Sequence, residues 1–207
     1  MTLYETTAAA ADRLSRELPG HRVEVLLGRI TATPHADGTH ALILSRLITT
    51  FHEAGARQAG LEYLQAIGLR LPSGPNDFAI PDFSLVEAGF RSAHVEQNCY
   101  APHTFRMVLE VTSPPTRSDD LGTKADCYAQ AAIPVYLVVD RRHDEAVLHT
   151  DPRGGEYRSR KPFKRGTSVP LPASIGAALD LSVNRLLDGE ESPHPTGGNV
   201  IFRHTFE

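Results

Sequence analysis

Residues 107–114, Met-Val-Leu-Glu-Val-Thr-Ser-Pro, place one acidic residue, Glu110, inside an apolar run that stops at a proline. Aliphatic and β-branched residues of this kind predict a strand. A carboxylate within such a strand is costly to bury unless another charge compensates it. A second apolar run, residues 81–86, carries Asp82 at a strand end, and Lys124 follows on a predicted helix. Two carboxylates that share a divalent cation are a stable solution, so the pattern indicates metal-assisted phosphodiester cleavage.

The elements that follow Glu110 predict an α/β fold. A helix is expected from the N-cap Ser118, with acidic residues in its first turn, to about residue 132, before Pro134. Residues 135–140, Val-Tyr-Leu-Val-Val-Asp, form a continuous apolar run that is typical of a strand buried on both faces. Strand, helix and strand therefore make one βαβ-like unit, for which a parallel, right-handed crossover is expected.

The rest of the chain alternates helical and extended segments without a repeat. Helices are predicted at residues 7–18 and 40–54, the second capped by Thr39, and a hairpin about Gly28 joins strands at 23–27 and 29–33. Further strands are expected at residues 64–69, 106–111, 146–150, 156–160 and 167–169. The prediction is a mixed central β-sheet flanked by helices, in a single domain at 1–188 that precedes a linker and tail at 189–207.

Composition is ordinary for a globular protein. The chain has 207 residues, of which 41% are hydrophobic and 22% charged, and can bury a sizeable core. Cys99 and Cys127 lack CxxC spacing and are expected to be packing residues. No apolar run approaches the ~20 residues of a membrane helix, and the N-terminus does not resemble a signal peptide, so we expect a cytoplasmic protein.

The net charge of −4 argues against a protein that coats nucleic acid by bulk electrostatics, although a nuclease needs only a basic groove. One basic segment stands out near the C-terminal end of the predicted sheet. We expect it to be a charged edge strand that resists aggregation, and a phosphate-binding surface is the alternative. Its members are Arg158, Arg160, Lys161, Lys164 and Arg165.

Taken together, several motifs resemble the Uma family of putative restriction endonucleases, a branch of the PD-(D/E)XK nuclease superfamily. They are the Pro-Asp pair at 81–82, the Glu-Val-x-Ser-Pro strand end at 110–114, Lys124 and Tyr128 on the next helix, and the apolar strand at 135–140. The first strand, with Glu24, and the helix start at His40 are also similar. The resemblance covers roughly residues 22–151, and it implies a restriction-endonuclease-like core with a metal site at Asp82 and Glu110.

The sequence departs from the superfamily pattern at Thr112. This position, two residues after Glu110, usually holds the lysine of the motif. Lys124 would supply the charge from the neighbouring helix instead, since a flexible lysine stem can deliver its ammonium to the same point in space. The Uma family resembles this chain in using the displaced position.

The resemblance and the residue chemistry together give each candidate a role. Asp82 and Glu110, with the Val111 carbonyl, would bind Mg²⁺ or Mn²⁺. Lys124 would hold the attacking water or neutralise charge on the phosphate, and Tyr128 would orient Lys124 or a phosphate oxygen. DNA is the expected substrate, and a homodimer is expected by analogy with nucleases of this fold.

Structural explanations remain open for the same residues. Asp82 can close a turn, Glu110 and Lys124 can form an internal ion pair, and Tyr128 can be a core residue. Glu24, flanked by valines, can point outward to solvent or join the acidic residues of the site. His40 can be an ordinary histidine or contact the phosphate or metal from the helix start.

Two classes of function follow from these alternatives. The first is a metal-dependent endonuclease that hydrolyses DNA. The second is a catalytically degenerate protein that binds nucleic acid or a protein partner on the same scaffold. A hydrolase of some other phosphate ester is a third possibility. Residues 200–206 have strand-like composition and are expected to dock as an added edge strand, across a dimer interface in one arrangement.

Overall fold

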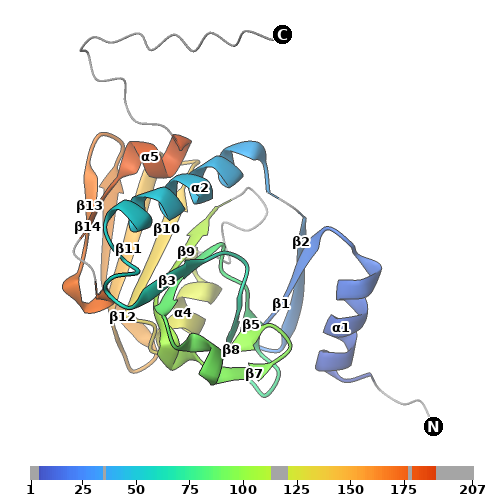
Figure 1. The fold of residues 1–207 in the computed structure, drawn as a ribbon. Coiled ribbons are helices and arrows are strands. Elements are labelled where there is room, and N and C mark those ends of the chain that lie inside the picture. The colour runs from blue at the N-terminus through green and yellow to red at the C-terminus, as the bar shows by residue number, and fades with distance from the viewer. Residues whose placement is uncertain (1–4, 35, 113–120, 177–178, 190–207) are drawn as a thin grey trace, which may run out of the picture.

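The computed structural model describes residues 5–34, 36–112, 121–176 and 179–189. These residues form two six-stranded mixed sheets and a two-stranded sheet, with helices packed against them (Figure 1). The predicted mixed α/β architecture is confirmed, except that the strands divide between two large sheets. The predicted strand at 200–206 lies outside the described residues. The predicted boundary between domain and tail, at residue 188, lies next to the end of the described part at residue 189.

The first sheet has the strand order β2-β1-β5-β4-β8-β7. The hairpin about Gly28 is confirmed, because its two strands pair antiparallel from Leu26 with Arg29 to His21 with Pro34. The strands are β1 (His21–Leu26), β2 (Arg29–Pro34), β4 (Gly68–Arg70), β5 (Phe78–Ala79), β7 (His94–Glu96) and β8 (Cys99–Tyr100).

The second sheet has the order β12-β11-β10-β9-β6-β3. The parallel pair predicted around the crossover helix is present: β9 and β10 run parallel, and α4 (Thr123–Gln130) joins them. Ser118 and the acidic residues after it lie outside the described residues. The strands are β3 (Leu61–Leu64), β6 (Phe83–Glu87), β9 (Phe105–Val111), β10 (Val135–Asp140), β11 (Glu145–Arg153) and β12 (Glu156–Lys164).

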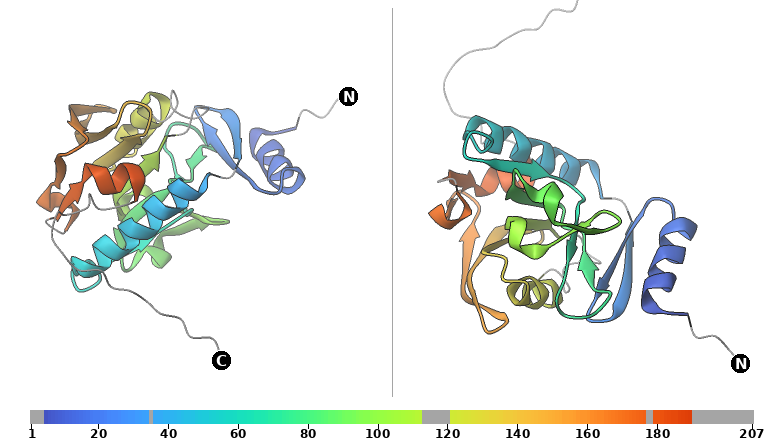
Figure 2. Two further views of the ribbon diagram at one scale, coloured as in Figure 1. Left: turned by 90° about the horizontal axis from the view of Figure 1, so that it is seen from above. Right: turned by 60° about the horizontal axis from the view of Figure 1, so that its bottom comes forward.

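Helices cover the outer face of this second sheet and one edge of the first. Helix α2 (Gly38–Glu53) and α5 (Val183–Asp188) lie side by side over one face of β9, β10 and β11, beside the small sheet of β13 (Ser168–Leu171) and β14 (Leu179–Ser182) (Figure 2, left). Helix α1 (Thr7–Glu17) packs on the β1–β2 hairpin. Short 3₁₀ turns occur at Phe90–Ala93, Pro102–Thr104 and Ala173–Ile175.

Strand alternation explains how β9 serves two cores. Leu109 and Val111 face α2 and α5, whereas Val108 belongs to the core on the opposite side, with α4 and the first sheet. Side chains alternate between faces along a strand, so Glu110 shares the face of Val108. The sheet therefore directs Glu110 toward α4.

Two sequence expectations are corrected by local geometry. The strand expected at 64–69 is two strands in different sheets, and Ala66, between them, has a left-handed backbone with φ 52°. The cap of α2 is Asp37 rather than Thr39, because Asp37 Oδ1 accepts the His40 N–H at 2.8 Å and the helix begins at Gly38.

Three other expectations concern surface and composition. The basic segment lies on and just after β12, which is the edge strand of its sheet, as expected. Cys99 and Cys127 are free and buried, and the prediction that they pack in the core is confirmed. Among the described residues, no helix is both long and apolar enough to cross a membrane.

Candidate active site

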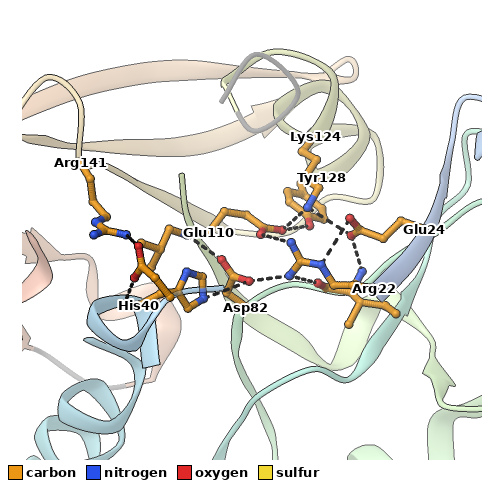
Figure 3. A network of polar contacts seen from close by, with 11 residues as sticks. Arg22, Glu24, His40, Asp82, Glu110, Lys124, Tyr128 and Arg141 are labelled. Atoms are coloured by element: carbon orange, nitrogen blue, oxygen red, sulfur yellow. Dashed lines mark hydrogen bonds and ion pairs between the residues drawn. The ribbon is translucent and has the colours of Figure 1, made fainter. Parts of the chain in front are cut away.

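The candidate site lies where β1 of the first sheet meets β6, β9 and α4 of the second (Figure 3). Strand β1 sends Val23 and Val25 to the core beside α1, so Arg22 and Glu24 project from its other face. Glu24 is only 2% exposed, which rules out the outward, solvated position considered from the sequence. Its Oε1 accepts the Ile80 N–H at 2.7 Å and lies 3.2 Å from Lys124 Nζ.

Asp82 immediately precedes β6 rather than ending a strand. Strand β6 runs antiparallel to β9, with Phe83 opposite Leu109, so the start of β6 meets the end of β9. This places the Asp82 carboxylate beside the strand that carries Glu110. Its Oδ2 accepts the Val111 N–H at 2.8 Å, which fixes the side chain in a buried position.

Glu110 receives two donors from α4. Lys124 and Tyr128 are four residues apart and thus share one helix face. Lys124 Nζ and the Tyr128 hydroxyl each donate to Glu110 Oε1 at 2.8 Å. Lys124 is 2% exposed and Tyr128 is fully buried, so a surface position for Lys124 is ruled out. The ammonium bridges Glu110 and Glu24, and both ion-pair and catalytic roles for Lys124 remain consistent with this geometry.

His40 reaches the site from the first turn of α2. Its Nε2 lies 3.4 Å from Asp82 Oδ1. The capping residue Asp37 also pairs with Arg141 at 2.8 Å, which ties the start of α2 to the residue that follows β10. The fold thus brings together all six residues predicted from the sequence: Glu24, His40, Asp82, Glu110, Lys124 and Tyr128.

Arg22 is the residue that sequence reasoning missed, and it lies at the centre of the network (Figure 3). Its Nη1 is 2.5 Å from Asp82 Oδ1, its Nη2 is 3.7 Å from Glu110 Oε2, and its Nε is 3.6 Å from Glu24 Oε2. A signal was available, because Arg22 precedes Glu24 by two residues and must share its strand face. We call Arg22, Glu24, Asp82, Glu110 and Lys124 the ion cluster.

A pocket of about 600 Å³ opens onto one side of the ion cluster. Arg22, His40 and Asp82 supply polar groups to its wall. Much of the remaining wall is apolar and includes Pro34, Leu44, Ile80 and Val111. The side chains of Glu24, Glu110 and Lys124 are at most 3% exposed, so these three charges lie deeper than the pocket wall.

Charge and burial set the protonation of the site. Burial alone would raise the pKa of Asp82, but the His40 hydrogen bond and the charges of Arg22, His40 and Lys124 outweigh it and hold the pKa well below its usual range. Burial, followed by the charges of Glu110 and Glu24, raises the pKa of Tyr128 well above that of a free phenol. Tyr128 is therefore a neutral hydrogen-bond donor near neutral pH, not a base.

The donor set fits a hard divalent cation. No three His, Cys, Asp or Glu side chains within the described part of the chain form a ready metal site. Mg²⁺, however, is usually held by one or two carboxylates, with waters and substrate phosphates in the remaining positions. Asp82 and Glu110 already share one cation, the Arg22 guanidinium. The Val111 N–H donates to Asp82. The N–H and C=O of one strand residue point toward the same side of the strand, so the Val111 carbonyl is also directed toward the Asp82 side of β9.

Comparisons with known proteins agree with this fold. A family model, Uma2, described as "Putative restriction endonuclease", matches residues 9–184, and the resemblance stated from the sequence is thereby confirmed. A crystal structure of a putative nuclease belonging to DUF820 from Anabaena variabilis is similar, with a TM-score of 0.65 and 16% identity over 83% of this chain and 94% of that chain. At that identity the likeness concerns the fold. No match was found among curated proteins.

Proposed function

Because this chain belongs to the Uma2 family of putative restriction endonucleases, we propose that it is a Mg²⁺- or Mn²⁺-dependent endonuclease that hydrolyses DNA phosphodiester bonds. The observation that carries the proposal is the convergence of Asp82 and Glu110 on one cation, with Lys124 donating to Glu110. Carboxylates brought together in this way, with Asp82 at the wall of a pocket and Glu110 behind it, can bind a metal ion and present it to a substrate phosphate.

Each residue has a distinct part in the proposed reaction. A bound divalent ion polarises the scissile phosphate and lowers the pKa of a water molecule. Asp82, Glu110 and the Val111 carbonyl would hold that ion. Lys124 supplies positive charge to offset the charge that grows on the phosphate, and such preorganised charge typically lowers a barrier by a few kcal/mol.

The remaining candidates act on these groups. Tyr128 donates to Glu110 Oε1 and fixes the orientation of that carboxylate. Glu24 holds the Lys124 ammonium from its other side. His40 lies against Asp82 at the pocket wall, where it is placed to contact a substrate phosphate as well.

The test is cleavage of plasmid and short duplex DNA in Mg²⁺, in Mn²⁺ and in EDTA. We expect cleavage with either metal and none in EDTA. Asp82→Asn keeps the side-chain size, and it should lower the rate by at least about a hundredfold, the scale seen when one charge-stabilising group is removed. Asp151→Asn is the matched control, since the Asp151 side chain is 46% exposed on β11, and it should retain the wild-type rate. Equal rates for Asp82→Asn and the wild type would reject the assignment.

A catalytically degenerate protein that binds nucleic acid or a protein partner is the second candidate. It is favoured by the position of Arg22, which takes up the carboxylates that a metal needs. Calorimetric titration with Mn²⁺ separates the two, because the nuclease requires binding that is lost in Asp82→Ala. Binding of DNA without such a Mn²⁺ signal would favour the second candidate.

We also propose, as expected from the sequence, that the protein is cytoplasmic and acts as a homodimer. Two strands of DNA require two cuts, and a symmetric pair of sites supplies them. Light scattering of the full chain at micromolar concentration measures the assembly directly.

A further inference from the structure

Arg22 separates the buried charges of the ion cluster from the pocket. Its side chain is 22% exposed and lines the pocket, whereas the Lys124 side chain is 3% exposed and lies behind the carboxylates. A ligand that enters the pocket therefore meets the Arg22 guanidinium before it reaches Lys124. The cation best placed to touch a substrate is one that no motif of the sequence assigned.

The same guanidinium also takes the position that a metal ion would need. Its three nitrogens are distributed over Asp82, Glu110 and Glu24, and Nη1 donates in addition to the Ile80 carbonyl at 2.9 Å. A divalent ion bound to Asp82 and Glu110 requires close oxygen contacts of about 2.0–2.1 Å. Two cations held by the same oxygens repel each other, so full occupancy by the ion and by Arg22 is unfavourable.

We propose that Arg22 is an exchangeable cation: it neutralises the carboxylates in the metal-free protein, and metal binding releases it into the pocket to bind a phosphodiester group of the substrate. The inference rests on the proposed function. Arg22 already borders the pocket, so a change of side-chain rotamers is enough to turn the guanidinium outward. A guanidinium pairs with two phosphate oxygens at once, which an ammonium does not.

The exchange also lowers the magnitude of the net charge of the site, which is −1 when the three carboxylates face Arg22 and Lys124 and 0 when a divalent ion replaces Arg22. Three carboxylates, from Glu24, Asp82 and Glu110, face Arg22 and Lys124 in the metal-free protein. Loss of Arg22 alone would leave three acidic groups against one ammonium, a net charge of −2, and a divalent ion neutralises that charge. Metal binding and release of Arg22 are thus expected to be coupled, with each favouring the other.

The first experiment measures Mn²⁺ affinity by calorimetry, which does not depend on cleavage. The variants are Arg22→Gln and, as a matched control on the same hairpin, Arg29→Gln, whose side chain is exposed. We expect Arg22→Gln to bind Mn²⁺ at least tenfold more tightly than the wild type and Arg29→Gln to be unchanged. Arg22→Gln should also have a lower melting temperature in EDTA, and saturating Mn²⁺ should close that gap. Unchanged or weaker Mn²⁺ binding by Arg22→Gln would overturn the proposal.

The second experiment tests the phosphate contact with Ca²⁺ in place of Mg²⁺ and a short fluorescent duplex as the probe. We expect Arg22→Gln to bind the duplex about tenfold more weakly than Arg29→Gln and to show a shallower dependence on salt, by about one unit of slope. Equal duplex binding by the two variants would overturn the release of Arg22 to phosphate. Arg22→Lys covers the case in which Arg22→Gln does not fold: it should keep the wild-type Mn²⁺ affinity within about threefold but lose duplex affinity, because it retains the charge and lacks the fork.

These outcomes are distinct from failure of the proposed function. If the wild-type protein cleaves DNA but Arg22→Gln shows no gain in Mn²⁺ affinity, then the nuclease activity is supported and the exchange of Arg22 is rejected. If the wild-type protein does not cleave DNA, Arg22→Gln binds Mn²⁺ more tightly and Asp82→Asn does not bind Mn²⁺, then the exchange of Arg22 is supported and the nuclease activity is rejected. Absence of Mn²⁺ binding in every variant overturns both.

Discussion

The ion cluster and the basic segment contain similar residues in opposite surroundings. In the ion cluster, the side chains of Glu24, Glu110 and Lys124 are at most 3% exposed. In the basic segment, Arg158 is 55% exposed and Lys164 is 66% exposed, and each pairs with a glutamate in contact with solvent. Exposed pairs contribute about 0–1 kcal/mol, whereas breaking a buried pair costs about 3–5 kcal/mol.

This difference shows why the number of charges in a segment does not reveal its function. The basic segment is the most conspicuous charge feature of the sequence, yet its charged groups lie on an edge strand where they also protect the sheet from pairing with another chain. The ion cluster draws two residues from β1 and one each from β9, α4 and the position before β6. Unless another cation takes their place, its charges cannot separate without leaving one of them unpaired in the protein interior.

Removal of the buried lysine should have the largest effect. Lys124→Met deletes the ammonium between Glu110 and Glu24 and leaves two buried carboxylates with less compensation. We expect the free energy of unfolding to fall by about 3–5 kcal/mol, measured by urea denaturation at pH 7. A loss below about 1 kcal/mol would show that the buried and exposed pairs are energetically alike.

A buried histidine on β11, the strand next to the edge strand, should have an intermediate, pH-dependent effect on the free energy of unfolding. His149 on β11 is 4% exposed and pairs across the sheet with Arg160. Burial, together with the charge of Arg160, lowers its pKa from 6.5 to about 4. Within the described residues its Nε2 has no hydrogen-bond partner.

The sign of this effect follows from proton binding. Between pH 6.5 and about 4 the unfolded chain binds a proton at His149 and the folded chain does not, so stability falls as the pH falls. The slope from this group approaches about 1.4 kcal/mol per pH unit. His149→Phe should therefore flatten the stability profile over that range. An unchanged slope in urea titrations at pH 4.5, 5.5 and 6.5 would assign the loss to other groups.

Substitution of the exposed lysine should have a small effect. Lys164→Met is the matched partner of Lys124→Met, because Lys164 pairs with Glu145 at 2.6 Å on the solvent side of β12. We expect a change in unfolding free energy below about 1 kcal/mol that disappears in roughly 1 M NaCl, where charges are screened within about 3 Å. A large, salt-independent loss would mean that the basic segment has a structural role similar to that of the ion cluster.

Deletion of residues 190–207 should have the smallest effect on stability. The predicted strand at 200–206 needs a free sheet edge, and β2, β3 and β7 are edge strands that lie outside the basic segment. We expect light scattering at micromolar concentration to report a monomer in place of a dimer. The unfolding free energy should change by less than about 0.5 kcal/mol when it is measured at a dilution at which both chains are monomeric. A dimer of the shortened chain would exclude a tail-mediated interface.

The sequence by itself determined the elements whose physical causes are local. The apolar run at 135–140 identified β10, the turn at Gly28 identified the first hairpin, and the helix between β9 and β10 identified a parallel pair. The spacing of Lys124 and Tyr128 placed both on one helix face, and the acid within β9 required a partner. These features depend on neighbours within a few residues, so the chain alone is sufficient.

Only the tertiary structure decided which groups meet. Asp82 and Glu110 approach each other because β6 and β9 run antiparallel. Glu24 approaches Lys124 because β1, in the other sheet, turns the face that carries Arg22 and Glu24 toward α4. The local signal for Arg22 is only that it shares a strand face with Glu24, and its other acidic partners, Asp82 and Glu110, are 60 and 88 residues away. Its central position follows from the packing of the first sheet against the second. Contacts between residues so distant in the chain form only when the whole fold has assembled.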